Sequence, residues 1–335
     1  MKAYAIQKYG KDQPLEMINK AIPKPAATQV LIEVRAVAVN VLDVKIKHGD
    51  FKQILKYNMP LVLGNDVAGV VTKVGKDVKK FKVGDIVYAY PGAKEIGTFS
   101  EYTAISEPAL AVAPQNVSAA AASGVPLVGL TAWQALVEKA NVQPGQKVFI
   151  QAGTGGVGSI AIQLAKHLGA YVATTAAAKN EAMLKKLGAD IVIDYKTQDF
   201  ETELEDYDVV LHSQDAQTLE KSLHILKPGG CLISISGPPD PAYAKAAGLP
   251  LLLQFAIKGL SFKVRRAAKK LGVSYSFLLV RPEGMQLQEI TKLIESGIIK
   301  PIVDTVYDFK DTPKALDHVE SGRSKGKVVI TITQQ

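Results

Sequence analysis

The stretch KVFIQAGTGGVGSIAIQLAKHL, residues 147–168, decides the fold of this chain. It begins with a short apolar run at 148–151, which predicts a buried strand, and it ends with an apolar pattern that predicts a helix. Between them lies a turn with glycines in GxGxxG spacing, at Gly153, Gly155 and Gly158. In such a turn the first glycine allows the bend, the second lets the backbone approach a pyrophosphate, and the third lets the helix pack closely on the strand.

We therefore predict that this turn binds the pyrophosphate of a dinucleotide, because the start of the helix also offers unpaired N–H groups and partial positive charge. The predicted cofactor-binding residues of this turn are Gly153, Thr154, Gly155, Gly156, Val157 and Gly158. The alternative is a glycine-rich turn that binds nothing. The strand before the turn and the helix after it favour the binding interpretation.

Strand-like runs recur after this turn and alternate with helical segments. The expected strands lie at 148–151, 171–175, 191–194, 209–211, 231–235 and 275–280, and the expected helices at 180–187, 219–226 and 242–271. This alternation predicts a doubly wound parallel sheet of the Rossmann type, with helices on both faces.

The two ends of the chain have a different pattern. Residues 1–122 contain short alternating runs separated by turns, which predict a compact, barrel-like β module. After Pro282 the pattern predicts a helix at 283–296, a strand at 302–306, a helix at 312–321 and a strand at 327–333. We expect this tail to close the N-terminal module. The fold class is therefore α/β, with one domain at 1–122 and 282–335 and a dinucleotide-binding domain at 123–281.

Composition narrows the classes of protein. A chain of 335 residues is long enough for two cores, and the single cysteine, Cys231, excludes an internal disulfide and a four-cysteine zinc site. The apolar run at 249–257 is too short to span a bilayer. We expect a cytoplasmic protein without a membrane partner.

The net charge of +8 and the basic run at 263–270 raise the possibility of nucleic-acid binding. Without an accompanying recognition motif, a solvated helix face is the favoured interpretation, and we expect no nucleic-acid partner. The positive potential could equally steer a polyanionic cofactor inward.

An ordered set of motifs resembles a known family along the whole chain. The motifs are NVLD at 40–43, LGNDVAG at 63–69, GTFSEY at 97–102, LVGLTAWQA at 127–135, LGAD at 187–190 and GRSKGK at 322–327. Together with the glycine turn they resemble the zinc-independent quinone and enone oxidoreductases of the medium-chain dehydrogenase/reductase superfamily. The resemblance implies a GroES-like substrate domain around an inserted Rossmann domain, and a homodimer.

The resemblance also bears on metal binding. Metal-dependent relatives carry a cysteine in the segment that matches 40–43, and Gly-His-Glu where this chain has Gly64, Asn65 and Asp66. The five histidines show no ligand spacing, so we interpret them as core or surface residues. We expect no metal ion, and therefore no Lewis-acid activation of an alcohol.

The second strand of the expected Rossmann domain suggests which nicotinamide cofactor binds. NAD-selective folds usually end this strand in an acid that holds the ribose 2′-hydroxyl, whereas this chain has Thr174 and Thr175, followed by Lys179. Hydroxyl and ammonium groups suit a 2′-phosphate, so we predict NADPH; the alternative for Lys179 is an ordinary surface lysine. The resemblance adds Tyr195 and Arg323 beside the phosphate. Further predicted contacts are Ser236, Gly237, Phe277 and Leu279.

A bound NADPH would deliver hydride to an electron-poor carbon, which favours a quinone or an α,β-unsaturated carbonyl as the acceptor. Groups that stabilise the resulting negative oxygen should come from the substrate domain. The candidate catalytic residues are Asn40, Asp43, Lys45, Tyr57 and Thr131. Lys45 resembles the lysine of plant-type enone oxidoreductases, but it could instead pair with Asp43.

Two other functions stay open at this point. One is an enoyl-thioester reductase, for which Tyr57 is the available catalytic tyrosine. The other is a non-catalytic protein that binds nucleotide as a redox sensor or RNA binder. The apolar segment at 249–260 is expected to cover either the cleft or an interface between subunits.

Overall fold

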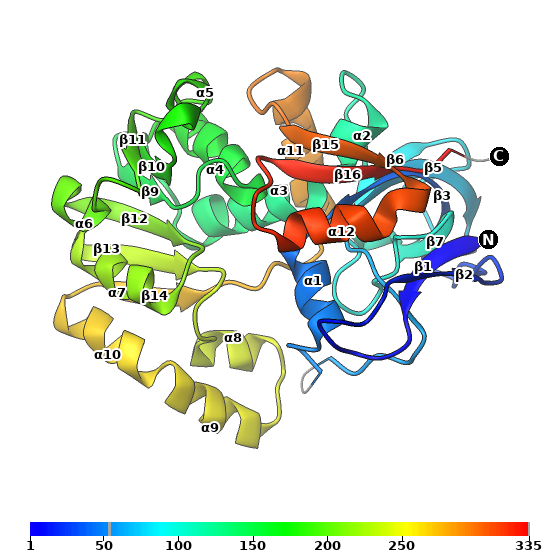
Figure 1. Ribbon diagram of the computed structural model, residues 1–335, viewed down its shortest axis with the longest axis horizontal. Coiled ribbons are helices and arrows are strands. Elements are labelled where there is room, and N and C mark those ends of the chain that lie inside the picture. The colour runs from blue at the N-terminus through cyan, green and yellow to red at the C-terminus, as the bar shows by residue number, and fades with distance from the viewer. Residues whose placement is uncertain (53–54, 334–335) are drawn as a thin grey trace. The chain divides into compact units, whose positions relative to one another are not determined.

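The protein is described by a computed structural model that covers residues 1–52 and 55–333 (Figure 1). The chain divides into two compact units. The first comprises residues 1–130 and 281–335, and the second comprises residues 131–280. The first unit extends past residue 122 because helix α2 (Ala119–Ser123) contacts strands β3 (Gln29–Val39) and β5 (Val67–Val74) of that unit.

The second unit is built on a parallel sheet with the strand order β11-β10-β9-β12-β13-β14. Its strands are β9 (Lys147–Ile150), β10 (Tyr171–Ala176), β11 (Ile191–Asp194), β12 (Tyr207–His212), β13 (Leu226–Ser234) and β14 (Ser274–Phe277). The chain starts in the middle, winds outward in one direction and then returns to wind in the other. This order confirms the predicted doubly wound sheet.

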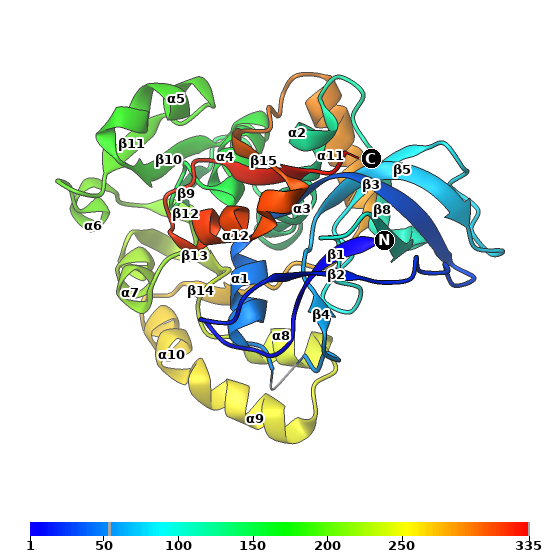
Figure 2. The ribbon, with the colours of Figure 1, turned by 45° about the vertical axis from the view of Figure 1, so that its right-hand side comes forward.

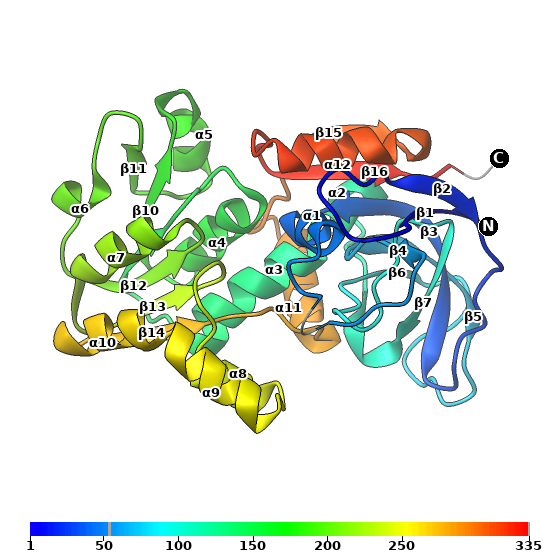
Figure 3. The same cartoon turned by 60° about the horizontal axis from the view of Figure 1, so that its bottom comes forward.

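Helices cover both faces of this sheet, as right-handed crossovers require. The helices α4 and α5 lie on one face, and α7 and α10 on the other (Figure 3). The helical segments of the unit are the π-helical turn at Gln134–Lys139, α4 (Gly156–His167), the 3-10 turn at Ala178–Asn180, α5 (Glu181–Lys186), α6 (Phe200–Glu203), α7 (Ala216–His224), α8 (Pro241–Ala246), α9 (Leu251–Leu260) and α10 (Phe262–Lys270).

The helical block expected at 242–271 is helical in the structure but is divided into three helices, α8, α9 and α10. Gly248, with a φ of 62°, follows the end of α8, and Pro250 precedes α9. Both residues are common helix boundaries, because glycine adopts the left-handed conformation easily and proline cannot continue a hydrogen-bonded helix. In the sequence, the apolar residues that follow Gly248 and Pro250 favoured a helix more strongly than these two residues favoured a boundary.

The first unit contains a mixed sheet with the order β15-β16-β3-β5-β6-β8, in which β7 also pairs with β3 (Figure 2). A smaller antiparallel sheet has the order β2-β1-β4. The remaining strands are β1 (Lys2–Ile6), β2 (Glu16–Asn19), β4 (Leu61–Val62), β6 (Ile86–Ala89), β7 (Tyr102–Ser106), β8 (Leu110–Val112), β15 (Val303–Asp308) and β16 (Lys327–Thr331).

The C-terminal tail completes this unit, as predicted. Strand β16 pairs antiparallel with β3, so that Val329 lies opposite Ala38. The helical segments of the unit are α1 (Val41–His48), the 3-10 turn at Glu107–Ala109, α2, the start of α3 (Pro126–Trp133), α11 (Gly284–Glu295), the 3-10 turn at Phe309–Asp311 and α12 (Thr312–Glu320). None of the helices in the described residues is both long and apolar enough to cross a membrane.

Candidate functional site

The glycine turn of the second unit lies between the end of β9 and the start of α4. A Cβ atom at Gly158 would lie 2.3 Å from the carbonyl oxygen of Ala152, and one at Gly153 would lie 2.3 Å from Thr174 Oγ1. Both distances are too short for any side chain, so these glycines allow strand, turn and helix to pack together. Gly155 instead borders open space, where an added Cβ would meet only the Ala152 oxygen, at 3.3 Å.

This geometry fits a bound pyrophosphate. The first N–H groups of α4 have no acceptor within their own helix, and glycine at the turn leaves them accessible. Thr154, Gly155, Gly156 and Val157 are all half-buried, so part of each reaches the surface. An anion at this place would accept from the backbone and complement the helix dipole.

Residues at the end of β10 form hydrogen bonds with the glycine turn. Thr175 Oγ1 accepts the N–H of Ala152 at 3.0 Å, and the Thr175 carbonyl accepts the N–H of Gly153 at 3.0 Å. The Thr174 hydroxyl donates to the Ile150 carbonyl at 2.6 Å and is completely buried. The expectation that Thr174 offers its hydroxyl to a phosphate is therefore wrong, because this side chain points inward and shapes the turn instead.

Two of the residues expected at the 2′-phosphate, Lys179 and Tyr195, lie at one edge of the sheet. Lys179 is exposed in the 3-10 turn after β10, and Tyr195, 61% exposed, follows β11. The strands are parallel neighbours, with Ala176 opposite Asp194, so both residues follow the carboxyl ends of adjacent strands. Asp194 is an acid at this edge, and its Oδ1 accepts the N–H of Lys196 within its own turn.

The expected contacts after β13 and β14 are only partly available. The Gly237 N–H donates to Ser234 Oγ at 2.7 Å, and the Ser236 hydroxyl, which is exposed, donates to the Gln214 carbonyl at 2.6 Å. The Phe277 N–H donates to Asp240 Oδ2 at 2.9 Å, so it cannot serve a ligand as we expected. Leu279 follows the end of β14 and is half-buried.

The buried histidine His212 and the cysteine Cys231 of this unit have structural roles. His212 is completely buried; its Nδ1 lies 2.8 Å from Ser234 Oγ and its Nε2 lies 3.0 Å from the Asp215 carbonyl oxygen. Since a carbonyl only accepts, Nε2 carries the proton. Burial lowers the pKa of His212 to about 4 and raises the pKa of Cys231 to about 11, so both are neutral at physiological pH. The interpretation of His212 as a satisfied core histidine is confirmed.

The first unit contains a buried polar cluster, which we define as Asn40, Asp43, Asn65, Asp66 and Lys327. All five are at most 6% exposed. They come from distant parts of the chain: Asn40 precedes α1, Asp43 lies in α1, Asn65 and Asp66 precede β5, and Lys327 begins β16.

Asp66 is the centre of this cluster. Its Oδ2 accepts from Asn40 Nδ2 at 2.9 Å and from Lys327 Nζ at 3.3 Å, and its Oδ1 accepts the N–H of Leu127 at 2.8 Å. Lys327 also donates to Asn40 Oδ1. Because Leu127 lies in the first turn of α3, Asp66 places a carboxylate at the positive end of that helix.

Asp43 is held separately. Its Oδ2 accepts the N–H of Asn40 at 2.7 Å, and its Oδ1 accepts from Asn65 Nδ2 at 2.7 Å. Burial raises the pKa of Asp43 to about 7, and burial also raises the pKa of Asp66 against the opposing effect of Lys327. The cluster thus holds two carboxyl groups and one ammonium group away from water.

These contacts correct three expectations. Asn40 and Asp43 are buried and fully engaged, so they cannot donate directly to a substrate oxygen. Asp43 pairs with Asn65 and not with Lys45, because residues two apart on a helix point in different directions. Sequence reasoning missed the role of Lys327, although its GRSKGK motif was noted, since its partners lie 261 and 287 positions away.

The cluster does not fit a zinc ion. Both Asp66 oxygens and both Asp43 oxygens already accept hydrogen bonds. Asn65 Oδ1 is buried without a hydrogen-bond partner in the described residues, but a lone amide oxygen is a poor zinc ligand. Nor do residues 1–52 and 55–333 contain a group of three or more His, Cys, Asp or Glu side chains that could hold a metal.

The other candidate catalytic residues occupy different environments. Lys45 is half-buried on α1. Tyr57 donates its hydroxyl to the Ala93 carbonyl at 2.7 Å, and burial raises the pKa of Tyr57 to about 12. Thr131 is buried in α3, and Arg323 is exposed after α12. The roles of Lys45, Tyr57, Thr131 and Arg323 stay predictions.

Replacing Lys327 by methionine should destabilise the first unit by about 3 kcal/mol, because it leaves the buried Asp66 without its cation. The double variant Asp66→Asn, Lys327→Met should recover part of this loss, since neither position of the pair then carries a charge. Urea unfolding followed by far-ultraviolet circular dichroism measures both, with the exposed Lys325→Met as the control. A single variant as stable as the control would contradict this account.

The raised pKa of Asp43 predicts a pH dependence of stability. The folded state prefers the protonated Asp43 carboxyl group. The contribution of this group to the free energy of unfolding is therefore complete below its ordinary pKa of 3.8 and is lost as the pH rises to about 7. Asn cannot ionise. Relative to Asp43→Asn, the natural protein should therefore lose stability between about pH 4 and pH 7. Urea unfolding across this range tests the prediction, with the exposed Asp77→Asn as control; equal slopes for both variants would refute it.

Comparison with known proteins agrees with this architecture. Residues 26–115 match the family described as "Alcohol dehydrogenase GroES-like domain", and residues 187–330 match the family described as "Zinc-binding dehydrogenase". The chain is similar to the crystal structure of Escherichia coli quinone oxidoreductase complexed with NADPH, with a TM-score of 0.83, 26% identity and coverage of 99% of this chain and 100% of that one.

Curated relatives are similar along almost the whole chain. The 2-methylene-furan-3-one reductase of Solanum lycopersicum is 36% identical over 98% of this chain and 79% of its own length. The chloroplastic NADPH-dependent alkenal/one oxidoreductase of Arabidopsis thaliana is 34% identical with the same coverage. With its GroES-like unit, its doubly wound sheet and its glycine turn, the chain belongs to the quinone and enone oxidoreductase family of the medium-chain dehydrogenase/reductase superfamily.

Proposed function

We propose that this protein reduces a quinone or an α,β-unsaturated carbonyl with NADPH and without a metal ion. The observation that carries the proposal is the turn from Gly153 to Gly158, whose backbone fits a pyrophosphate. Strand β10 does not end in an acid; Lys179 follows it, and Tyr195 follows the neighbouring strand β11. The names of the relatives from Solanum lycopersicum and Arabidopsis thaliana support enone reduction, and the Escherichia coli structure supports quinone reduction with NADPH.

Bound NADPH supplies the hydride. The chain's own residues hold the dinucleotide by its phosphates and provide positive charge for the oxygen that becomes negative. We propose Lys45 for this second role, because it is half-buried on α1 and Asp43 does not neutralise it. Asn40 and Asp43 are positioning residues: their capping box fixes the start of the helix that carries Lys45.

The alternative of an enoyl-thioester reductase has less support. It depends on Tyr57 as the proton donor, and the Tyr57 hydroxyl already donates to the Ala93 carbonyl. We keep the homodimer and the cytoplasmic location as proposals; the first rests on the family resemblance and the second agrees with a chain that has a single cysteine. We also propose that the first unit, residues 1–130 and 281–335, binds the substrate and that the second unit, residues 131–280, binds the cofactor; these bounds replace the boundaries expected at 122 and 282.

Purified protein should oxidise NADPH when 1,4-benzoquinone or a long-chain enone is added, and the loss of reduced-nicotinamide absorbance follows the reaction. A chelator should leave the rate unchanged, because the Asp43 and Asp66 oxygens in the polar cluster are already hydrogen-bonded and an amide oxygen such as Asn65 Oδ1 is a poor zinc ligand. Loss of activity on chelation would overturn the metal-free proposal. Binding of NADPH without turnover of either acceptor would favour a nucleotide-binding sensor.

Replacing Lys179 by alanine should weaken NADPH binding by about tenfold or more and leave NADH binding nearly unchanged, since only NADPH carries the 2′-phosphate. Titration of both nucleotides by isothermal calorimetry measures the difference. Lys186→Ala, an exposed lysine on α5, is the matched control. Equal losses for the two nucleotides would show that Lys179 does not contact the 2′-phosphate.

A further inference from the structure

Helices α9 and α10 run end to end along the second unit, with Ser261 between them (Figures 1 and 2). On α9 the buried residue is Ile257. Leu251, Leu252 and Phe255 lie on the opposite side and are 72%, 81% and 69% exposed. At one hundred degrees per residue these three share one face of the helix. So much exposed apolar surface on one face is unusual for a protein that meets only water.

Helix α10 continues this face with positive charge. Its buried residues, Val264 and Ala268, are four apart and face the core of the unit. The exposed side of α10 carries Phe262 with Lys263, Arg266, Lys269 and Lys270. Four cations therefore share the exposed side of α10 with one aromatic ring.

Arg265 fixes the junction of the two helices. Its side chain donates to the Lys258 carbonyl at 2.9 Å and to Ser261 Oγ at 3.1 Å. The arginine thus links α10 to the last turn of α9. We call the exposed residues on these two faces the docking face: Leu251, Leu252, Phe255, Lys258, Phe262, Lys263, Arg266, Lys269 and Lys270.

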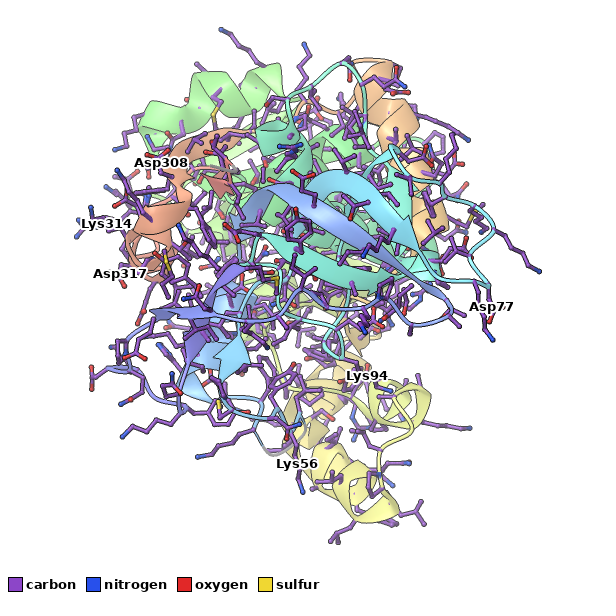
Figure 4. The ribbon with its side chains drawn as sticks, turned by 90° about the vertical axis from the view of Figure 1, so that its right-hand side faces the viewer. Lys56, Asp77, Lys94, Asp308, Lys314 and Asp317 are labelled. Atoms are coloured by element: carbon purple, nitrogen blue, oxygen red, sulfur yellow. The ribbon has the colours of Figure 1, made fainter. Side chains whose placement is uncertain are left out.

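The charge of the whole chain is concentrated in this region. Residues 241–282 contain eight Lys and Arg and no Asp or Glu, while the chain as a whole has 40 basic and 32 acidic residues. The other residues therefore carry 32 of each sign and are neutral overall. By contrast, α12 in the first unit carries both signs, with Lys314 and Asp317 on the same helix (Figure 4). Near the docking face, exposed Glu220 lies 3.8 Å from Lys263, a separation that gives weak pairing.

We propose that the docking face binds the surface of a membrane that contains anionic lipids. A helix with exposed leucine and phenylalanine beside a row of lysine and arginine lies in the plane of the interface: the apolar side chains enter the acyl boundary, and the cations meet the negative headgroups. The expectation of no membrane partner considered only a segment that spans the bilayer, and this surface contact needs none.

Charge and chemistry disfavour the other occupants. A second copy of this chain that paired through the same face would bring two strongly positive surfaces together. An RNA strand would satisfy the cations and could stack a base on Phe255 or Phe262, but it would leave Leu251 and Leu252, 72% and 81% exposed, in contact with water. An anionic membrane matches both the charge and the apolar side chains.

The full-length protein tests the proposal by flotation with lipid vesicles. It should bind vesicles of equal parts phosphatidylserine and phosphatidylcholine, should not bind phosphatidylcholine alone, and should be released at about 0.5 M salt, where surface electrostatics are screened. The variant Lys263→Glu, Arg266→Glu should reduce binding at least tenfold. The variant Leu252→Ser, Phe255→Ser should reduce it similarly through lost apolar contact.

The control variant Lys73→Glu, Lys76→Glu changes the net charge by the same amount at exposed positions of the first unit, and it should bind as the natural protein does. NADPH titration confirms that each variant is folded. The proposal is overturned if the protein ignores anionic vesicles, if it binds neutral and anionic vesicles equally, or if the control loses as much binding as the docking-face variants. Binding of oligouridine in place of vesicles, or a dimer lost in Leu252→Ser, Phe255→Ser without vesicle binding, would assign the face to RNA or to a second copy.

Discussion

The ion pair between Asp66 and Lys327 is the interaction on which the first unit depends. It joins the residue before β5 to the start of the C-terminal strand β16, and Asn40, at the end of β3, bonds to both partners. Burial of two charges is costly unless the geometry satisfies them, and here each Asp66 oxygen has a donor. The same carboxylate caps α3 at Leu127. Asp66 therefore connects strands β5 and β16 with the starts of helices α1 and α3.

This cluster also explains what α1 can contribute to chemistry. The Asn40 and Asp43 side chains cap the helix and pack inward, and this arrangement leaves Lys45 on a different side of α1. The polar groups at 40–43 and 64–66, the segments in which the resemblance places the ligands of metal-dependent relatives, bind one another instead. Their role is to hold the framework, and the proposed hydride transfer needs no Lewis acid from them.

The second unit obeys another constraint, the close approach of backbone to backbone at the glycine turn. Gly153 and Gly158 have no room for a side chain, and Thr174 and Thr175 fill the space below them. Because the binding that we propose uses main-chain N–H groups, such a turn is recognisable in any sequence that keeps the glycines between a strand and a helix. The docking face on α9 and α10 is independent of this turn, although it belongs to the same unit.

The sequence by itself determined the doubly wound sheet, the glycine turn and the closure of the first unit by its tail, because buried parallel strands are continuous apolar runs and the turn needs glycine at fixed spacing. It did not reveal that α8, α9 and α10 are separate helices, since their apolar residues hid the signals at Gly248 and Pro250. Only the tertiary structure decided the roles of Asn40, Asp43, Thr174 and Lys327. The physical reason is that a polar side chain points toward its partners, and these partners lie on other strands and helices, up to 287 positions away along the chain.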